Sequence, residues 1–229
     1  MSARATRRTV LAAETESGVF PPLDPKRAVR ALRRADPKLA RLIALAGPCR
    51  LSPTHYPPFR ALFRSIVYQQ LSGKAAATIL GRVLALFAPK EFPDPEDVLR
   101  LDDAALRAAG LSRNKLLAVR DLAQKTLDGV VPDLQALARM DDQEIIDRCD
   151  AVRGVGRWTV EMMLIFNLGR PDVLPVDDLG VRKGAQRVYG LRKLPDAKKL
   201  EKLAEPWRPW RSVGSWYMWR AAELPRGTL

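Results

Sequence analysis

The chain has 229 residues, 47% of them hydrophobic, which is enough for one or two compact domains with a sizeable core. Its 39 Lys and Arg against 26 Asp and Glu give a formal net charge of +13, which favours a polyanionic partner over a basic surface that serves solubility alone. The two cysteines, Cys49 and Cys149, and the single histidine exclude a cysteine-ligated iron–sulfur cluster and argue against a structural zinc site, and no apolar stretch approaches the roughly 20 residues of a membrane span.

The first half of the chain predicts helices, because apolar residues recur at helical spacing and alternating runs are short and rare. Residues 1–20 are interpreted as a flexible basic tail. One or two helices broken at Pro37 are expected over 25–45, followed by a proline-rich connector and a helix over 59–70. Ser72 is placed as the N-cap of the next helix.

The second half continues the helical pattern. Helices are expected from Pro95, at about 102–109, after Ser112 and around 132–139. Asp141 and Glu144 suit a capping box for the helix QEIIDRCDAV, which is expected to stop at Arg153-Gly154. The next helix is expected from about 157 to 167. The loop RPDVLPVDD precedes a helix from residue 179, and Ser212 is a candidate cap for a last helix. The predicted fold class is all-α.

Residues 152–169, VRGVGRWTVEMMLIFNLG, place two glycines around Val155 between two predicted helices. Glycine supplies the positive φ or the close backbone approach that a tight turn needs, so an ordinary helix–helix turn would explain them. The alternative is a phosphate site, because the N–H groups that begin a helix are unsatisfied donors at the positive end of its dipole. In that case Val155 would fill the core beneath the turn.

The strings DAVRGVGRWT and VLPVDDLGVRKG together resemble the helix–hairpin–helix (HhH-GPD) DNA glycosylase superfamily, in its 3-methyladenine DNA glycosylase II branch. FRALFRSIVYQQLSGKAA and WRPWRS with Trp219 resemble two further family segments. The resemblance implies two helical subdomains, one of residues 21–58 with 175–229 and one of residues 59–174. The helix–hairpin–helix, residues 142–168, is expected at the cleft between them.

The resemblance implies double-stranded DNA containing alkylated bases as the partner of a monomeric enzyme. Gln70 and Leu71 match the wedge that fills the space of a flipped base; the alternative is that Gln69 and Gln70 satisfy backbone groups at a helix end. A monovalent cation between the hairpin carbonyls and a phosphate is also implied, with no other metal or cofactor. The implied DNA-binding residues are Gly154, Val155, Gly156, Arg157, Thr159, Gln70, Leu71, Ser72 and Lys74.

Cleavage of an N-glycosidic bond builds positive charge on the sugar, which a carboxylate can stabilise while a water attacks. The loop offers Asp177 and Asp178, and alignment on D-L-G-V-R places the family's catalytic aspartate at Asp178. Asp177 remains the alternative if the alignment slips by one residue. Asp178 also suits the N-cap of the helix from Leu179, and this role is compatible with catalysis.

Alkylated purines carry a delocalised positive charge that electron-rich aromatic faces attract. The resemblance places Trp158, Met162 and Trp219 in the base pocket. Met162 stands where one branch of the family has a tyrosine. Trp207 and Trp210 are interpreted as core residues. Trp158 also occupies the position of the lysine nucleophile of the lyase branches, and tryptophan cannot form a Schiff base, so a monofunctional enzyme that leaves an abasic site is expected.

Two alternatives remain. One is a non-catalytic helix–hairpin–helix protein that binds damaged DNA, which would have no need of the aspartate or of the tryptophans around it. The other is a glycosylase of the same fold for deaminated or oxidised bases. The implied location is the cytoplasm, in association with a bacterial nucleoid, without a membrane partner.

Overall fold

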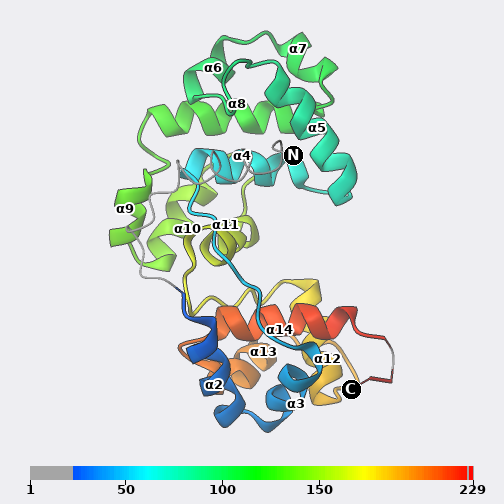
Figure 1. Cartoon of the computed structure of the whole chain (residues 1–229). Helices are drawn as coiled ribbons and strands as arrows, with labels where there is room; N and C mark the ends of the chain where they lie inside the picture. The colour runs from blue at the N-terminus through cyan, green and yellow to red at the C-terminus, as the bar shows by residue number, and fades with distance from the viewer. Residues whose placement is uncertain (1–22, 226, 229) are drawn as a thin grey trace, which may run out of the picture. The chain divides into compact units, whose positions relative to one another are not determined.

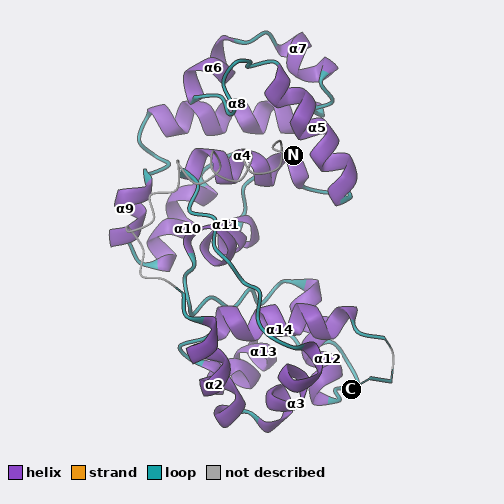
Figure 2. Ribbon diagram, viewed as in Figure 1, coloured by secondary structure: helices purple, strands orange, loops and turns teal. Residues whose placement is uncertain are grey.

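The computed structural model describes residues 23–225 and 227–228, and within these ranges every regular element is a helix (Figure 1, Figure 2). The all-α prediction is therefore confirmed. The predicted tail, residues 1–20, lies outside the described residues. The described chain divides into two compact units: unit 1 comprises residues 55–163, and unit 2 comprises residues 23–54 together with 164–225 and 227–228. The chain thus changes unit at 54/55 and 163/164, rather than at the 58/59 and 174/175 expected from the sequence.

The elements of unit 1 are α4 (Pro58–Tyr68), α5 (Gly73–Ala85), α6 (Pro95–Arg100), α7 (Asp103–Ala108), α8 (Arg113–Leu127), α9 (Leu134–Arg139), α10 (Asp142–Asp150) and α11 (Arg157–Met163). Several begin where local signals place them. Ser72 and Ser112 cap α5 and α8 by accepting hydrogen bonds from backbone N–H groups, and Pro95 occupies the first position of α6.

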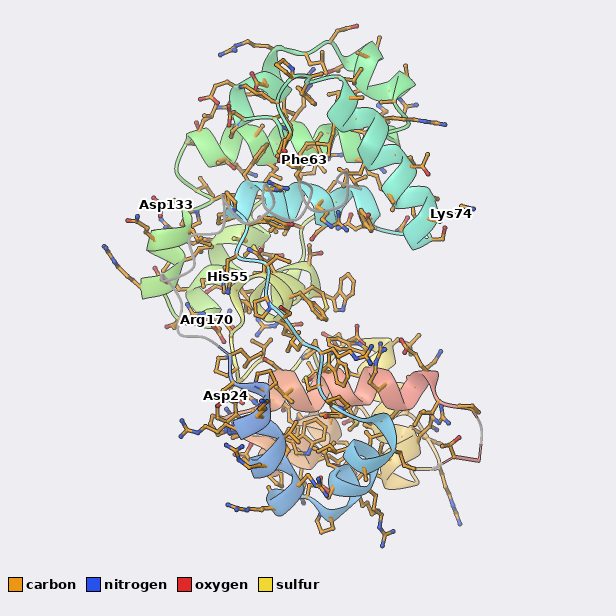
Figure 3. All side chains as sticks on the ribbon, viewed as in Figure 1. Asp24, His55, Phe63, Lys74, Asp133 and Arg170 are labelled. Atoms are coloured by element: carbon orange, nitrogen blue, oxygen red, sulfur yellow. The ribbon has the colours of Figure 1, made fainter. Side chains whose placement is uncertain are left out.

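The core of unit 1 forms where α8 packs on α4 and α6. Phe63, labelled on α4 in Figure 3, is fully buried, and its ring centroid lies 5.4 Å from that of Phe92. Arg120 of α8 fixes the end of α6, since its guanidinium donates to the carbonyls of Val98 and Leu99 at 3.0 and 2.8 Å. These carbonyls have no partner inside the helix, so the arginine satisfies groups that water would otherwise bind.

The elements of unit 2 are α2 (Pro25–Ala35), α3 (Pro37–Ala46), the π-helix η1 (Leu164–Leu168), α12 (Leu179–Tyr189), α13 (Ala197–Ala204), the 3-10 helix η2 (Glu205–Trp207) and α14 (Arg211–Glu223). Two expectations need correction. The α-helix expected from about 157 to 167 ends at Met163 and continues as the π-helix. Ser212 does not cap α14, because it lies inside that helix and its hydroxyl donates to the carbonyl of Arg170. Helix α13, capped by Asp196, was not anticipated.

Asp36 joins the early and late segments of unit 2. It is 7% exposed, and its Oδ1 caps α3 by accepting from the N–H groups of Lys38 and Leu39 at 2.9 and 3.0 Å. Its Oδ2 accepts from the hydroxyl of Tyr189 and, at 3.1 Å, from Nε1 of Trp207. Burial raises the pKa of Asp36, but these hydrogen bonds outweigh it and leave the pKa below its usual value. Trp207 is fully buried, which agrees with its interpretation as a core residue, whereas Trp210, interpreted in the same way, is only half-buried.

We predict that Asp36→Asn lowers the free energy of unfolding at pH 7 by roughly 1.5–3 kcal/mol, because asparagine keeps the cap but removes the charge that Tyr189 and Trp207 stabilise. The lowered pKa means that this contribution is present above the unfolded-state value of 3.8 and is lost as the pH falls through the folded-state value. Chemical denaturation at several pH values should show the gap between wild type and variant closing in acid.

The matched control is Asp196→Asn. Asp196 is exposed and caps α13 by accepting a hydrogen bond of 2.8 Å from the N–H of Lys199. The unfolding free energy of this variant should stay within about 0.5 kcal/mol of wild type, since Asp and Asn cap equally well. Equal losses in the two variants would contradict a special role for Asp36.

Candidate functional site

The predicted hairpin of unit 1 runs from α10 through a turn to α11. Val155 is 3% exposed, and its N–H donates to the carbonyl of Val152 at 3.0 Å, so it fills the core beneath the turn as expected. Asp121 of α8 accepts from the N–H of Arg153 at 2.7 Å, which ties the entry of the turn to a core helix. Burial raises the pKa of Asp121, but hydrogen bonds from Arg153 and Lys125 bring it below its usual value.

The two glycines of the hairpin have different reasons to be glycine. Gly154 has φ +74°, in the left-handed region that other residues rarely adopt. Gly156 has no such constraint, and a Cβ built on it would lie 4.0 Å from the nearest described atom, Oδ1 of Asp150. The turn therefore requires glycine at 154 only. At Gly156 the missing side chain leaves the start of α11 open to a ligand.

The first residues of α11 divide between the surface and the core. The Arg157 guanidinium donates to Oε1 of Gln143 at 3.0 and 3.1 Å, and its Nε lies 3.3 Å from Oε1 of Glu161, so it is fixed across the hairpin. Trp158 is 45% exposed. Thr159 is only 5% exposed, so its side chain packs inside unit 1. The half-buried Met162 follows one turn after Trp158.

The segment after α4 is tied to the hairpin by polar contacts. Nε2 of Gln69 donates to the carbonyl of Gly154 at 2.8 Å, so it satisfies a backbone group in the hairpin turn and not, as the alternative had it, at a helix end. Nζ of Lys115 donates to the carbonyls of Val67 and Gln69 at 2.7 and 2.8 Å, and burial lowers the pKa of this lysine. Sequence analysis missed Lys115, because nothing local marks an amine that caps a distant helix.

The exposed residues after Gln69 include a strained position. Gln70 has φ +57°, which is uncommon for a residue with a side chain, and such strained positions are found at binding sites among other places. Leu71 is 40% exposed, and Ser72 and Lys74 lie exposed at the start of α5, where Figure 3 labels Lys74. Gln70 and Leu71 are therefore presented outward, as a wedge would need.

In unit 2, the structure separates the two aspartates of the loop. Asp178 is 9% exposed, whereas Asp177 is exposed. Oδ1 of Asp178 caps α12 by accepting from the N–H of Val181 at 2.7 Å, and it also accepts from Nε1 of Trp219 at 2.8 Å. Two donors from different helices thus fix the orientation of this carboxylate. Asp178 has the geometry of a preorganised charged group, and Asp177 does not.

The Asp178–Trp219 hydrogen bond depends on the close packing of α12 against α14. A Cβ at Gly180 would lie 2.7 Å from Cδ1 of Trp219, and a Cβ at Gly184 would lie 2.0 Å from the carbonyl oxygen of Met218. Both separations are far below van der Waals contact. Only glycine therefore allows the backbones to approach closely enough for the indole of Trp219 to reach Asp178.

Trp219 belongs to an aromatic group that sequence analysis identified only in part. The rings of Phe166 and Trp219 lie 5.3 Å apart at 33°, and Phe166 is 39% exposed. Together with Trp216 they line a hollow of about 320 Å³. Phe166 was missed because LIFN reads as an apolar helix face. The π-helical turn changes the phase of the side chains and leaves Phe166 at the surface.

Other features of the described residues bear on chemistry. No three His, Cys, Asp or Glu side chains of the described chain cluster as metal ligands would, and none of its helices is long and apolar enough to cross a membrane. Burial raises the pKa of the Cys149 thiol to about 11 and also raises that of Cys49. These thiols are therefore protonated at neutral pH and unsuited to nucleophilic attack.

Comparisons with known proteins match the chain to the family that its sequence motifs resemble. The family model described as HhH-GPD superfamily base excision DNA repair protein matches residues 63–209. DNA-3-methyladenine glycosylase 1 of Schizosaccharomyces pombe is 36% identical over 191 residues, which cover 82% of this chain and 84% of that protein.

Solved structures show the same likeness. A 3-methyladenine DNA glycosylase of Schizosaccharomyces pombe, in complex with abasic DNA, has a TM-score of 0.77 at 35% identity and covers 86% of this chain and 97% of its own. A DNA-3-methyladenine glycosidase of Bacillus halodurans has a TM-score of 0.77 at 38% identity, with coverages of 86% and 89%.

We predict that Gly184→Ala lowers the free energy of unfolding by roughly 3 kcal/mol or more, because its methyl group would force α12 away from the backbone of Met218. Thermal and denaturant unfolding followed by circular dichroism would measure the loss.

Gly81→Ala is the matched control. Gly81 also lies inside a helix, α5, but nothing is within 4 Å of its Cβ position. It should raise stability by about 0.5–1 kcal/mol, since alanine is the better helix former. A neutral Gly184→Ala would contradict the close-packing account.

Proposed function

The chain belongs to the HhH-GPD superfamily of base excision DNA repair proteins, and on this premise we propose that it is a DNA glycosylase acting on alkylated purines. Its proposed substrates are 3-methyladenine and 7-methylguanine in double-stranded DNA. The observation that carries the proposal is the Asp178 carboxylate, which is nearly buried and is oriented by donors from α12 and α14.

The proposed reaction is hydrolysis of the bond between base and deoxyribose. As this bond lengthens, positive charge develops on the sugar, and a preorganised carboxylate stabilises that charge more than a solvated one does. Asp178 is the proposed stabiliser and orients the attacking water. Its two donors keep the carboxylate in position, so little reorganisation is needed when the charge appears.

DNA binding is assigned to the hairpin and to the turn after α4. The N–H groups at the start of α11 suit a phosphate, and the open space at Gly156 lets a backbone approach them. Gln70 and Leu71 are proposed to fill the gap left by the flipped nucleotide, with Ser72 and Lys74 on the phosphates nearby. This grip does not depend on the base sequence, as a repair enzyme requires.

Base recognition is assigned to aromatic and thioether side chains. The delocalised positive charge of an alkylated purine favours stacking on electron-rich rings, and the exposed Trp158 and the Trp219–Phe166 pair offer such rings. The assignment of Trp158, Met162 and Trp219 to the base pocket stays a prediction. The tryptophan at 158 supports a monofunctional enzyme, because it supplies no amine for a covalent intermediate.

We predict that Asp178→Asn lowers base release from methylated duplex DNA by roughly 100-fold or more, the effect of removing a preorganised electrostatic stabiliser. Asparagine still caps α12 and still accepts from Trp219, so the variant removes the charge and little else. Chromatography of the released bases gives the rate, and hot alkali reveals abasic sites by strand breakage.

Asp177→Asn is the control, because its carboxylate is exposed one residue away. It should retain activity close to wild type. Strand breaks without alkali would contradict a monofunctional mechanism. If folded wild type releases no base from methylated, deaminated or oxidised DNA, the protein is a binder of damaged DNA and the catalytic proposal fails.

We also predict that Gly156→Ala weakens binding to duplex DNA by about tenfold or more, because its methyl group displaces a phosphate from charge-assisted hydrogen bonds worth roughly 1.5–3 kcal/mol. Its folded stability should barely change, since the site has room for a Cβ. Fluorescence anisotropy at several salt concentrations would give the affinity, which should fall steeply with salt.

Gly154→Ala differs from Gly156→Ala in its effect on folded stability. Its φ of +74° makes alanine costly, so unfolding stability should fall by about 1 kcal/mol. Unchanged DNA affinity in Gly156→Ala would remove the hairpin from the proposed interface.

A further inference from the structure

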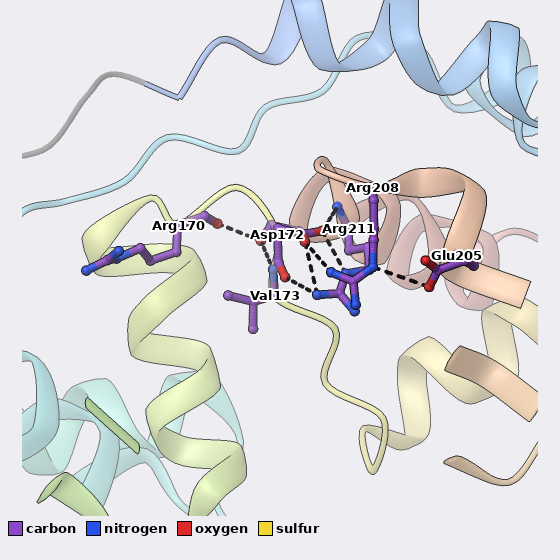
Figure 4. A network of polar contacts seen from close by, with 7 residues as sticks. Arg170, Asp172, Val173, Glu205, Arg208 and Arg211 are labelled. Atoms are coloured by element: carbon purple, nitrogen blue, oxygen red, sulfur yellow. Dashed lines mark hydrogen bonds and ion pairs between the residues drawn. The ribbon is translucent and has the colours of Figure 1, made fainter. Parts of the chain in front are cut away.

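The loop that carries Asp178 is fixed at its far end by a charged network. Asp172 accepts from Arg211 of α14 through Nε at 2.7 Å and through Nη2 at 3.0 Å (Figure 4). The same Nη2 donates to the Asp172 carbonyl at 2.8 Å. Arg208 adds a bond of 2.7 Å to Oδ2 of Asp172 and a second, at 3.2 Å, to Glu205. Two arginines thus bind the carboxylate of Asp172, and Glu205 holds one of them.

Ser212 adds a neutral anchor beside this network. It is fully buried, its hydroxyl donates to the carbonyl of Arg170 at 2.6 Å, and it accepts from the N–H of Val173 at 3.0 Å. Its own backbone N–H donates to the carbonyl of Pro171 at 3.0 Å. Backbone groups on both sides of Asp172 are therefore held by the first turn of α14 (Figure 4).

Helix α14 holds the loop at both ends. Arg211 and Ser212 fix residues 170–173, and Trp219, about two turns further along the same helix, donates to Asp178. Between these points Val173, Leu174 and Pro175 are buried. Besides the N–H of Val181 in α12, the Asp178 carboxylate is thus held by one helix, α14, which is attached to the loop at both of its ends.

We propose that Asp172, Arg211 and Ser212 are positioning residues for the Asp178 carboxylate. The inference rests on the proposed function for its activity readout. A guanidinium fork fits three acceptors in one geometry and is pre-organised, so it sets the orientation of the loop and not only its proximity. A stabilising carboxylate needs such support, because displacement by about 1 Å can cost roughly 100-fold in rate.

The test is Arg211→Lys, which keeps the net charge of the chain and so leaves long-range attraction to DNA unchanged. A lysine ammonium cannot reproduce the planar contacts with Oδ1, Oδ2 and the carbonyl of Asp172. We expect the single-turnover rate of base release to fall roughly 10- to 100-fold, with unchanged affinity for a duplex that contains a stable abasic-site analogue. The indole N–H resonance of Trp219, assigned by its loss in Trp219→Phe, should shift.

Arg120→Lys is the matched control. Arg120 and Arg211 have similar exposure, 23% and 17%, and each holds a carboxylate together with at least one backbone carbonyl. Both variants should lose stability, but at a temperature where both are folded only Arg211→Lys should change the rate and the resonance. Ser212→Ala, which removes the neutral anchor, provides a second variant if Arg211→Lys does not fold.

A double-variant cycle distinguishes positioning from a general structural loss. Because Arg211 is proposed to act through the charge of Asp178, Arg211→Lys should have little further effect in an Asp178→Asn background. An equal fold-loss in both backgrounds would overturn the inference, and so would a rate and a resonance that match those of Arg120→Lys. If wild type releases no base, the proposed function fails, and the Trp219 resonance alone decides: a shift supports positioning and its absence refutes it.

Discussion

The close approach of α12 to α14 is the constraint on which the arrangement around Asp178 depends. Two glycines four residues apart present no Cβ to α14, so the backbone of Met218 packs directly on Gly184 and the indole of Trp219 packs on Gly180. This contact brings the indole of Trp219 to the carboxylate of Asp178. A larger residue at either glycine would push α12 and α14 apart and so separate Nε1 of Trp219 from the carboxylate of Asp178.

Asp178 combines a structural role with a proposed chemical one. As the N-cap of α12 it satisfies a backbone N–H that the helix leaves without a partner, and the same bond orients its charge. The carboxylate proposed to act in catalysis is thereby oriented by a contact that the fold already needs. The second donor, from Trp219, restricts the rotation that a cap alone would permit.

The basic excess of the chain is not all available to DNA. Arg120 satisfies carbonyls at the end of α6, and Arg187 donates to the carbonyls of Ala222 and Leu224 near the end of α14. Lys115 closes the end of α4 in the same way. These cations hold helix ends together, because a guanidinium or an ammonium satisfies several carbonyls at once. Net charge indicates the class of partner, but the structure decides which charges face it.

The sequence by itself determined what depends on neighbours along the chain. Caps such as Ser72, Ser112 and Asp178, the proline that begins α6 and the paired glycines of the hairpin act within a few residues, so their patterns predicted the helices and the turn. The motif strings also indicated the family. The preference for Asp178 over Asp177 rested on alignment in the sequence, and the structure adds that Asp178 is nearly buried and Asp177 exposed.

Tertiary structure decided every role that needs a partner far along the chain. Ser212 resembles a helix cap in sequence but anchors the loop through Arg170 and Val173, about 40 residues away. Phe166 reaches the surface because a π-helical turn changes the phase of its segment. Lys115 and Arg211 contact groups that only packing brings to them. A hydrogen bond between distant residues has no periodicity to detect, so the fold must form before such a role exists.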